Sequence, residues 1–79
     1  MSIIRKKILP EYFEAVQENR KKFELRKDED NIQVGDELIL EEWNGEYTGR
    51  YTNRKVTYVL RNVPEYRLND GYCIIGWCW

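Results

Sequence analysis

The segment Tyr72–Trp79 constrains the fold most, because it reads as a strand with apolar side chains on both faces. A strand without a polar face needs a covered position inside a sheet, with a neighbour on each side. The segment is also far shorter than the roughly 20 residues that a membrane-spanning helix requires. A chain of 79 residues therefore has to arrange its other strands around this one, and we expect residues 1–79 to form a single domain.

The rest of the chain predicts one early helix and four further strands. Pro10 suits the first turn of a helix, where its missing N–H group is no loss, and Phe13 and Val16 then share one helical face. The predicted helix covers Pro10–Glu18, and the predicted strands cover Ile3–Leu9, Lys22–Lys27, Glu37–Trp43, Tyr51–Leu60 and Tyr72–Trp79.

Alternation with a period of two assigns the faces of the predicted strands. In Lys22–Lys27, Phe23 and Leu25 share one face, and the charged Glu24 and Arg26 lie on the opposite, outer face. In Tyr51–Leu60, the inward residues are expected to be Val56, Tyr58 and Leu60. The polar residues 44–50, with Arg50 at their end, are expected to form a loop.

These elements predict an α+β, mostly β fold in the order β-α-β-β-β-β. A small five-stranded barrel, closed or half-closed, with the N-terminal helix packed on it, gives the apolar final strand a covered position on both faces. The alternative is a flat open sheet with one helix.

The composition excludes several kinds of chemistry. The chain has no His, which removes Ser-His-Asp and Cys-His catalysis together with the commonest zinc ligand. Cys73 and Cys78 lie five residues apart on a predicted strand, about 16 Å from each other, which is too far for a disulfide. We expect both to be reduced, buried thiols. The acidic run Glu41, Glu42 and Glu46 has no calcium-loop spacing, so no metal and no cofactor is predicted.

The charges are distributed unevenly, although the net charge is only −1. The balance is +4 over residues 1–27, −8 over residues 28–46 and +3 over residues 47–79. This asymmetry indicates separate basic and acidic surfaces rather than a general polyanion binder. No apolar stretch of signal-peptide length follows the N-terminus, so the expected location is the cytoplasm, without a membrane partner.

The most pointed local feature is the segment Asn19–Arg26, in which a helix end, a basic loop and a strand follow one another. Lys21, Glu24 and Arg26 converge there and offer an ammonium, a carboxylate and a guanidinium to a small ligand. Arg and Lys suit phosphate or carboxylate groups, and Glu accepts hydrogen bonds from ring or exocyclic N–H groups. The competing interpretation is an exposed strand face with alternating, solvated charges.

The spacing Lys-x-x-Glu-x-Arg of Lys21, Glu24 and Arg26 resembles the signature of ASCH domains in the PUA-like superfamily. Three further segments resemble a branch of short phage and bacterial ASCH-like proteins, and the likeness covers about residues 6–79. These segments are Ile8–Phe13, Gln33–Asp36 and Tyr47–Arg50.

The resemblance implies a PUA-like barrel with a cleft between helix and barrel, and a role in binding RNA or a nucleotide-like ligand. Lys21, Glu24 and Arg26 would line this cleft, with Lys7 and Arg50 as further ligand-binding residues. The alternative is a small amidohydrolase acting on acylated nucleosides, with Lys21 and Glu24 as candidate catalytic residues. The Lys-Thr-Glu pattern of such enzymes is matched only in part, because Glu24 stands where the Thr is expected and Glu65 is the sole acid near the expected position of the Glu.

The aromatic residues leave two other interpretations open. Trp77 and Trp79 share a strand face and are more typical of a core than of a base-stacking platform. Trp43 ends a strand beside a Gly-containing loop, so a partly exposed indole is equally plausible. A protein-binding adaptor that uses Trp43 is therefore a further alternative. The oligomeric state is left open.

Overall fold

The computed structural model describes residues 1–63, 65, 67–68 and 70–78, and it is mostly β with one short helix. The five strands form one sheet in the order β1-β3-β4-β5-β2. Only β1 and β3 pair in parallel, and the other neighbours are antiparallel. The elements are β1 (Ile3–Ile8), α1 (Pro10–Gln17), β2 (Phe23–Lys27), β3 (Glu37–Trp43), β4 (Tyr47–Leu60) and β5 (Tyr72–Trp77).

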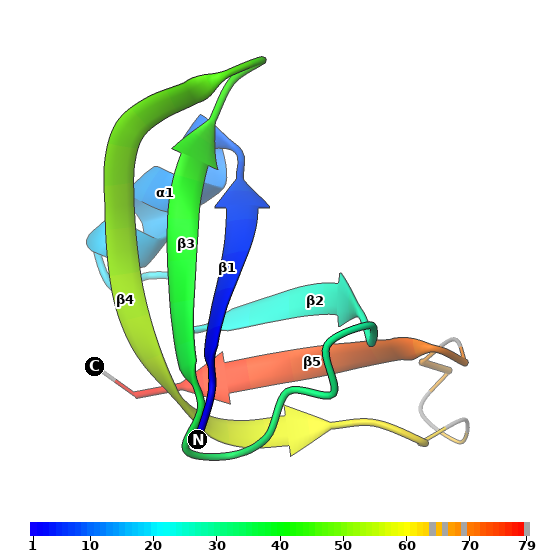
Figure 1. Ribbon diagram of the computed structural model, residues 1–79. Helices are drawn as coiled ribbons and strands as arrows, with labels where there is room; N and C mark the ends of the chain where they lie inside the picture. Colours follow the sequence, from blue (N-terminus) through cyan, green and yellow to red (C-terminus); the bar gives the residue numbers. More distant parts are fainter. Residues whose placement is uncertain (64, 66, 69, 79) are drawn as a thin grey trace.

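The long strand β4 divides the sheet into two arms. Residues 47–55 of β4 pair with β3, and residues 56–60 pair with β5, with a register shift between Val56 and Tyr58. Figure 1 shows β4 curving from an upper arm, which contains β3 and β1, into a lower arm, which contains β5 and β2. The helix α1 lies behind the upper arm.

The sheet is strongly bent but not closed, because β1 and β2 remain as its two edges. A closed barrel is therefore not confirmed. The predicted interior position of the last strand is confirmed, since β5 lies between β4 and β2. Only one face of β5 is fully buried, through Cys73, Ile75 and Trp77, whereas Tyr72 is exposed and Ile74 is half-buried on the other face.

The core lies between α1 and the inner face of the sheet. Phe13 and Val16 are buried on one side of the helix, as the spacing predicts. They join a cluster with apolar side chains from β3, β4 and β5, of which Leu40, Val56 and Ile75 are among the most deeply buried. Burial of this face holds a helix that has only eight residues and would not be stable alone.

The faces of β2 are the reverse of those predicted. Phe23 and Leu25 are 51% and 56% exposed, whereas Glu24 is only 6% exposed. The antiparallel register explains this result, because Glu24 lies opposite Ile75 and Arg26 lies opposite Cys73, and both partners are buried. The interior strand β5 thus decides which face of β2 is turned inward.

Tyr58 is also not an inward residue, since it is 64% exposed. The register shift between Val56 and Tyr58 is the reason. An irregularity of this kind changes which side of the strand the following residues face. Val56 is buried as predicted, and Leu60 is half-buried.

Both cysteines are free, but only Cys73 is buried. The prediction that Cys78 is buried is wrong, because β5 ends at Trp77 and Cys78 follows it in an exposed position. Burial raises the pKa of the Cys73 thiol. Trp77 is buried as a core residue, and the expectation for Trp79 lies outside the described residues.

Candidate binding pocket

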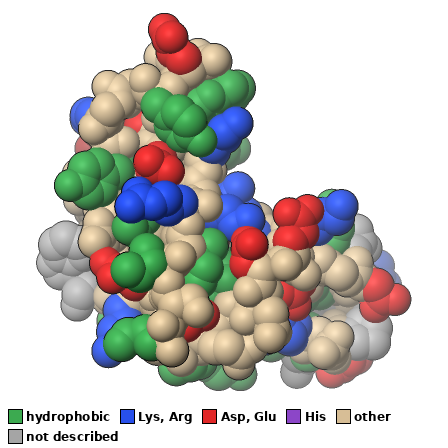
Figure 2. Space-filling model, in the orientation of Figure 1, with side chains coloured by type: hydrophobic (Ala, Val, Ile, Leu, Met, Phe, Trp, Pro, Cys, Tyr) green, Lys and Arg blue, Asp and Glu red, His purple; other side chains and the backbone are tan. Residues whose placement is uncertain are grey.

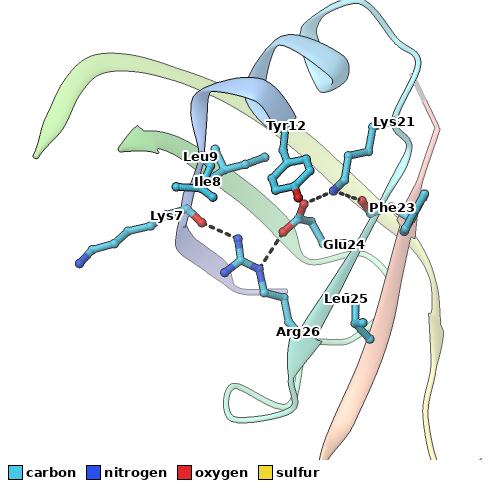
Figure 3. Close-up of a pocket in the computed structure, with 9 residues that line it drawn as sticks. All are labelled: Lys7, Ile8, Leu9, Tyr12, Lys21, Phe23, Glu24, Leu25 and Arg26. Atoms are coloured by element: carbon cyan, nitrogen blue, oxygen red, sulfur yellow. Dashed lines mark hydrogen bonds and ion pairs between the residues drawn. The ribbon is translucent and has the colours of Figure 1, made fainter. Parts of the chain in front are cut away.

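A pocket of about 370 Å³ lies where the end of β1, the start of α1 and the strand β2 meet. Figure 2 shows Lys or Arg side chains in the angle between the two arms of the sheet. The lining mixes charged with apolar and aromatic groups, which Figure 3 shows as sticks. The residues are Lys7, Ile8, Leu9, Tyr12, Lys21, Phe23, Glu24, Leu25 and Arg26.

The structure brings Lys21, Glu24 and Arg26 together as predicted. The Lys21 ammonium donates to Glu24 Oε1, and Arg26 Nε donates to Glu24 Oε2 at 2.8 Å. The Glu24 side chain is 8% exposed, against 18% for Lys21 and 26% for Arg26. A buried carboxylate is tolerated when cations neutralise it and donate to its oxygens. The three side chains are therefore an inward-facing ion-paired cluster, not an exposed row of charges.

The helix end directs Lys21 into this pocket. Asn19 has a φ of 61°, the left-handed conformation that commonly ends a helix. The N–H groups of Arg20 and Lys21 both donate to the carbonyl of Ala15, at 2.9 and 3.0 Å. This reversal returns the chain toward the helix start. The Lys21 ammonium then donates to the Phe23 carbonyl at 2.6 Å and lies 5.7 Å from the ring centroid of Tyr12.

Lys7 lines the pocket, and its main chain contacts Arg26. Its carbonyl accepts a hydrogen bond from Arg26 Nη2, which connects the two edge strands β1 and β2 across the open side of the sheet. The Lys7 side chain points away from Glu24 (Figure 3). Its ammonium lies 4.8 Å from the ring of Trp43 and 5.8 Å from that of Tyr47. Trp43 is half-buried, in agreement with a partly exposed indole.

Arg50 does not line the pocket. It lies in β4 rather than in the predicted loop, because the turn after β3 spans only residues 44–46, where Gly45 takes a φ of 108°. The Arg50 guanidinium donates to both oxygens of Glu42, at 2.9 and 2.8 Å, and also to Glu14 of α1. Arg50 thus joins the helix to the sheet, and nothing in its sequence position indicated these partners.

The carboxyl group of Glu42 has a pKa well below its usual range. Hydrogen bonds from Arg50 and Thr48 lower the pKa of Glu42 to about 2, and burial opposes this shift less strongly than either bond supports it. A carboxyl group whose pKa is lower in the folded than in the unfolded chain stabilises the fold above its unfolded pKa, near 4.5. This stabilisation is lost as the pH falls from there toward 2.

We therefore expect acid to destabilise the wild type more than the variant Glu42→Gln. The measurement is the free energy of unfolding in urea at about pH 6 and about pH 3, on either side of the unfolded pKa. Glu46→Gln, on the exposed turn beside β3, is the control and should behave as the wild type. Equal losses for the wild type and Glu42→Gln would contradict the assigned ion pair.

Tyr12 is one of five pocket residues that were not predicted to bind a ligand, together with Ile8, Leu9, Phe23 and Leu25. Figure 3 shows its phenol ring directed toward the pair formed by Lys21 and Glu24. It is 46% exposed and precedes the buried Phe13. The sequence signal for Tyr12 was its aromatic side chain on the polar side of a short helix, where an exposed ring is available to a ligand. Within the described residues, no cluster of three His, Cys, Asp or Glu side chains is arranged to hold a metal ion.

The chain is a mostly β protein with a bent, open sheet that carries an ion-paired pocket between β1, α1 and β2. Comparison with known proteins identifies its family. The chain belongs to the family described as domain of unknown function DUF3850, whose profile matches residues 5–77. It is also similar to a protein of Escherichia phage P2 described as an uncharacterized 12.9 kDa protein in the GpA 3′ region. The two are 43% identical over 54 residues, which make up 67% of this chain and 50% of the phage protein. The chain thus matches about half the length of this relative.

In the described part of the chain, the helix falls short of the length and apolar character that a membrane crossing requires.

Proposed function

We propose that this chain is an RNA- or nucleotide-binding module of the ASCH/PUA-like type, and that its ligand occupies the pocket between β1, α1 and β2. The observation that carries the proposal is the pocket cluster of Lys21, Glu24 and Arg26, in which the Lys21 ammonium lies 5.7 and 5.1 Å from the ring centroids of Tyr12 and Phe23. The cluster holds two cations and one carboxylate, so it retains a net positive charge for a phosphate or a polar base edge.

The shape and lining of the pocket favour a nucleotide over a bare anion. A volume of about 370 Å³ lies within the range of small-molecule sites. Tyr12 directs its ring toward the cluster (Figure 3), and Leu9, Phe23 and Leu25 add apolar surface to the lining. Aromatic side chains bind unpaired bases by stacking, whereas a phosphate alone would leave this apolar surface uncovered.

The bent sheet is consistent with a half-closed relative of the PUA-like barrel. In this proposal the opening between β1 and β2 is the cleft, and the hydrogen bond from Arg26 to the Lys7 carbonyl crosses it. The Pro10 to Gln17 helix forms one wall through Tyr12. We expect the module to act in the cytoplasm, where RNA and nucleotides are its ligands.

The second candidate function is hydrolysis of an acylated nucleoside, with Glu24 as general base and Lys21 as the electrophilic group. The contact between these two side chains favours it. Two observations count against it, since both oxygens of Glu24 already accept from cations and Glu65 does not line the pocket. A general base needs an oxygen within reach of a substrate proton.

The binding proposal predicts that the affinity for RNA depends only weakly on salt and that Lys21→Ala lowers this affinity. A short single-stranded RNA should bind with a salt slope that corresponds to roughly two to four phosphate contacts, because few cations line the pocket. Lys21→Ala should weaken binding at every salt concentration. The measurement is fluorescence anisotropy of labelled RNA across a salt series.

Lys55→Ala is the matched control, since Lys55 is an exposed lysine of β4 outside this pocket. It should change neither affinity nor slope appreciably. A slope typical of an extended basic groove, or equal effects of the two substitutions, would place RNA on another surface.

A further inference from the structure

The polar groups on the floor of the pocket are paired in a way that leaves hydrogen-bond donors for a ligand. Each oxygen of Glu24 already accepts a charge-assisted hydrogen bond, one from Lys21 and one from Arg26. With the side chain 8% exposed, the carboxylate is committed to holding these two cations. Its role in the pocket is to position donors rather than to accept from the ligand.

The donors of the two cations are only partly used. A guanidinium has five N–H groups, and Arg26 uses Nε for Glu24 and Nη2 for the Lys7 carbonyl. Within the residues that the structure describes, Arg26 Nη1 has no hydrogen-bond partner. The Lys21 ammonium donates to Glu24 and to the Phe23 carbonyl, so one of its three N–H groups remains. The floor is therefore rich in donors.

A floor of donors under an apolar rim selects among the nucleobases. Guanine carries two adjacent acceptors, O6 and N7, on the edge that lies away from its ribose, and Arg or Lys commonly binds this edge. Adenine has N7 beside the N6 amino group, which would set a donor against the donors of the pocket. Because the O6/N7 edge points away from the sugar, it can reach the floor while the ribose and phosphate stay outside.

We propose that the pocket binds the guanine base through its O6/N7 edge, with Arg26 and Lys21 as donors and with Tyr12 against the ring. This inference rests on the proposed nucleotide-binding function and adds the class of base. It also assigns Glu24 as a positioning residue that holds both donors at the floor.

The test is a comparison of nucleosides that differ in this edge, measured by isothermal titration calorimetry with the wild type. Guanosine should bind about 5- to 150-fold more tightly than adenosine, the range expected for one well-placed pair of contacts to a base edge. Inosine keeps O6 and N7 and lacks only the N2 amino group, so it should bind like guanosine. 7-Deazaguanosine lacks the N7 acceptor and should bind more weakly than guanosine.

A variant assigns the selectivity to Arg26. Arg26→Met should reduce the ratio of guanosine to adenosine affinity toward one, because it removes the donors and keeps much of the aliphatic length. Arg5→Met is the control, since Arg5 is an exposed arginine of β1 that does not line the pocket, and it should keep the wild-type ratio.

Each outcome bears on a different claim. If guanosine and adenosine bind equally, or if inorganic phosphate binds as well as guanosine 5′-monophosphate, the base assignment is overturned while the pocket remains a binding site. If no nucleoside, nucleotide or guanine-containing RNA binds, the proposed function itself fails. Preference for guanosine and inosine that disappears in Arg26→Met supports both.

Discussion

Replacing Phe13 with alanine should lower the free energy of unfolding by about 3–5 kcal/mol, the usual cost of truncating a buried aromatic side chain. Phe13 is 1% exposed and belongs to the core between α1 and the sheet. The Arg50 guanidinium lies 4.7 Å from its ring centroid, so the substitution also removes a contact of the group that ties helix to sheet. Urea unfolding followed by tryptophan fluorescence measures the effect.

The neighbouring aromatic residue of the same helix provides the control for Phe13→Ala. Tyr12 is 46% exposed, so Tyr12→Ala should cost much less stability than Phe13→Ala. A loss below about 1 kcal/mol for Phe13→Ala would mean that the helix does not pack on the sheet through this face.

Glu24→Gln should weaken ligand binding by about 1–3 kcal/mol, on the scale of a charge-assisted hydrogen bond. Glutamine keeps one acceptor oxygen but sets an amide donor against either Lys21 or Arg26, which then loses its fixed position. The measurement is the dissociation constant of a short single-stranded RNA for the wild type and for the variant. Glu29→Gln is the control, because it removes a carboxylate charge at an exposed position just beyond β2. It should leave binding unchanged.

The same variant separates the binding module from the hydrolase. A general base at Glu24 would make Glu24→Gln bind normally while turnover of an acylated nucleoside falls about 10²- to 10⁴-fold. Chromatography of acylated nucleosides incubated with the wild type should show no turnover if Glu24 only positions donors.

The elements that could be predicted from sequence are those set by local patterns. Pro10 begins α1, and the spacing of Phe13 and Val16 identifies the buried side of the helix. The apolar strand β5 is interior, as its two apolar faces require. The step from an interior strand to a closed barrel does not follow, because β5 has a strand on each side within an open sheet and only one of its faces is fully buried.

The faces of β2 could not be predicted, because alternation defines two faces but not which one is buried. The apolar face of Phe23 and Leu25 is exposed, and the charged face is turned inward. This arrangement depends on partners distant in the chain, namely the β5 register and the Lys7 carbonyl that accepts from Arg26. The grouping of Lys21, Glu24 and Arg26 was recognisable from spacing, whereas their burial was not.

The position of Arg50, in the upper arm, also could not be predicted from the sequence. A polar segment with two glycines predicted a loop, but the tight turn at Gly45 lets β4 begin at Tyr47. Arg50 then lies opposite the helix, where the carboxylates of Glu14 and Glu42 accept hydrogen bonds from its guanidinium. Such a cluster forms only when three separate elements are assembled, so no single segment of the chain indicates it.

The most direct test of the proposed pocket is an NMR titration of the ¹⁵N-labelled chain with a short guanine-containing single-stranded RNA. We expect the largest chemical-shift changes at the amides of Lys7–Leu9, Tyr12 and Lys21–Arg26, the residues around the pocket. The amides around Trp43 and Tyr47 should shift less. The largest changes at that hairpin, with the Lys21–Arg26 amides unmoved at saturation, would contradict the account.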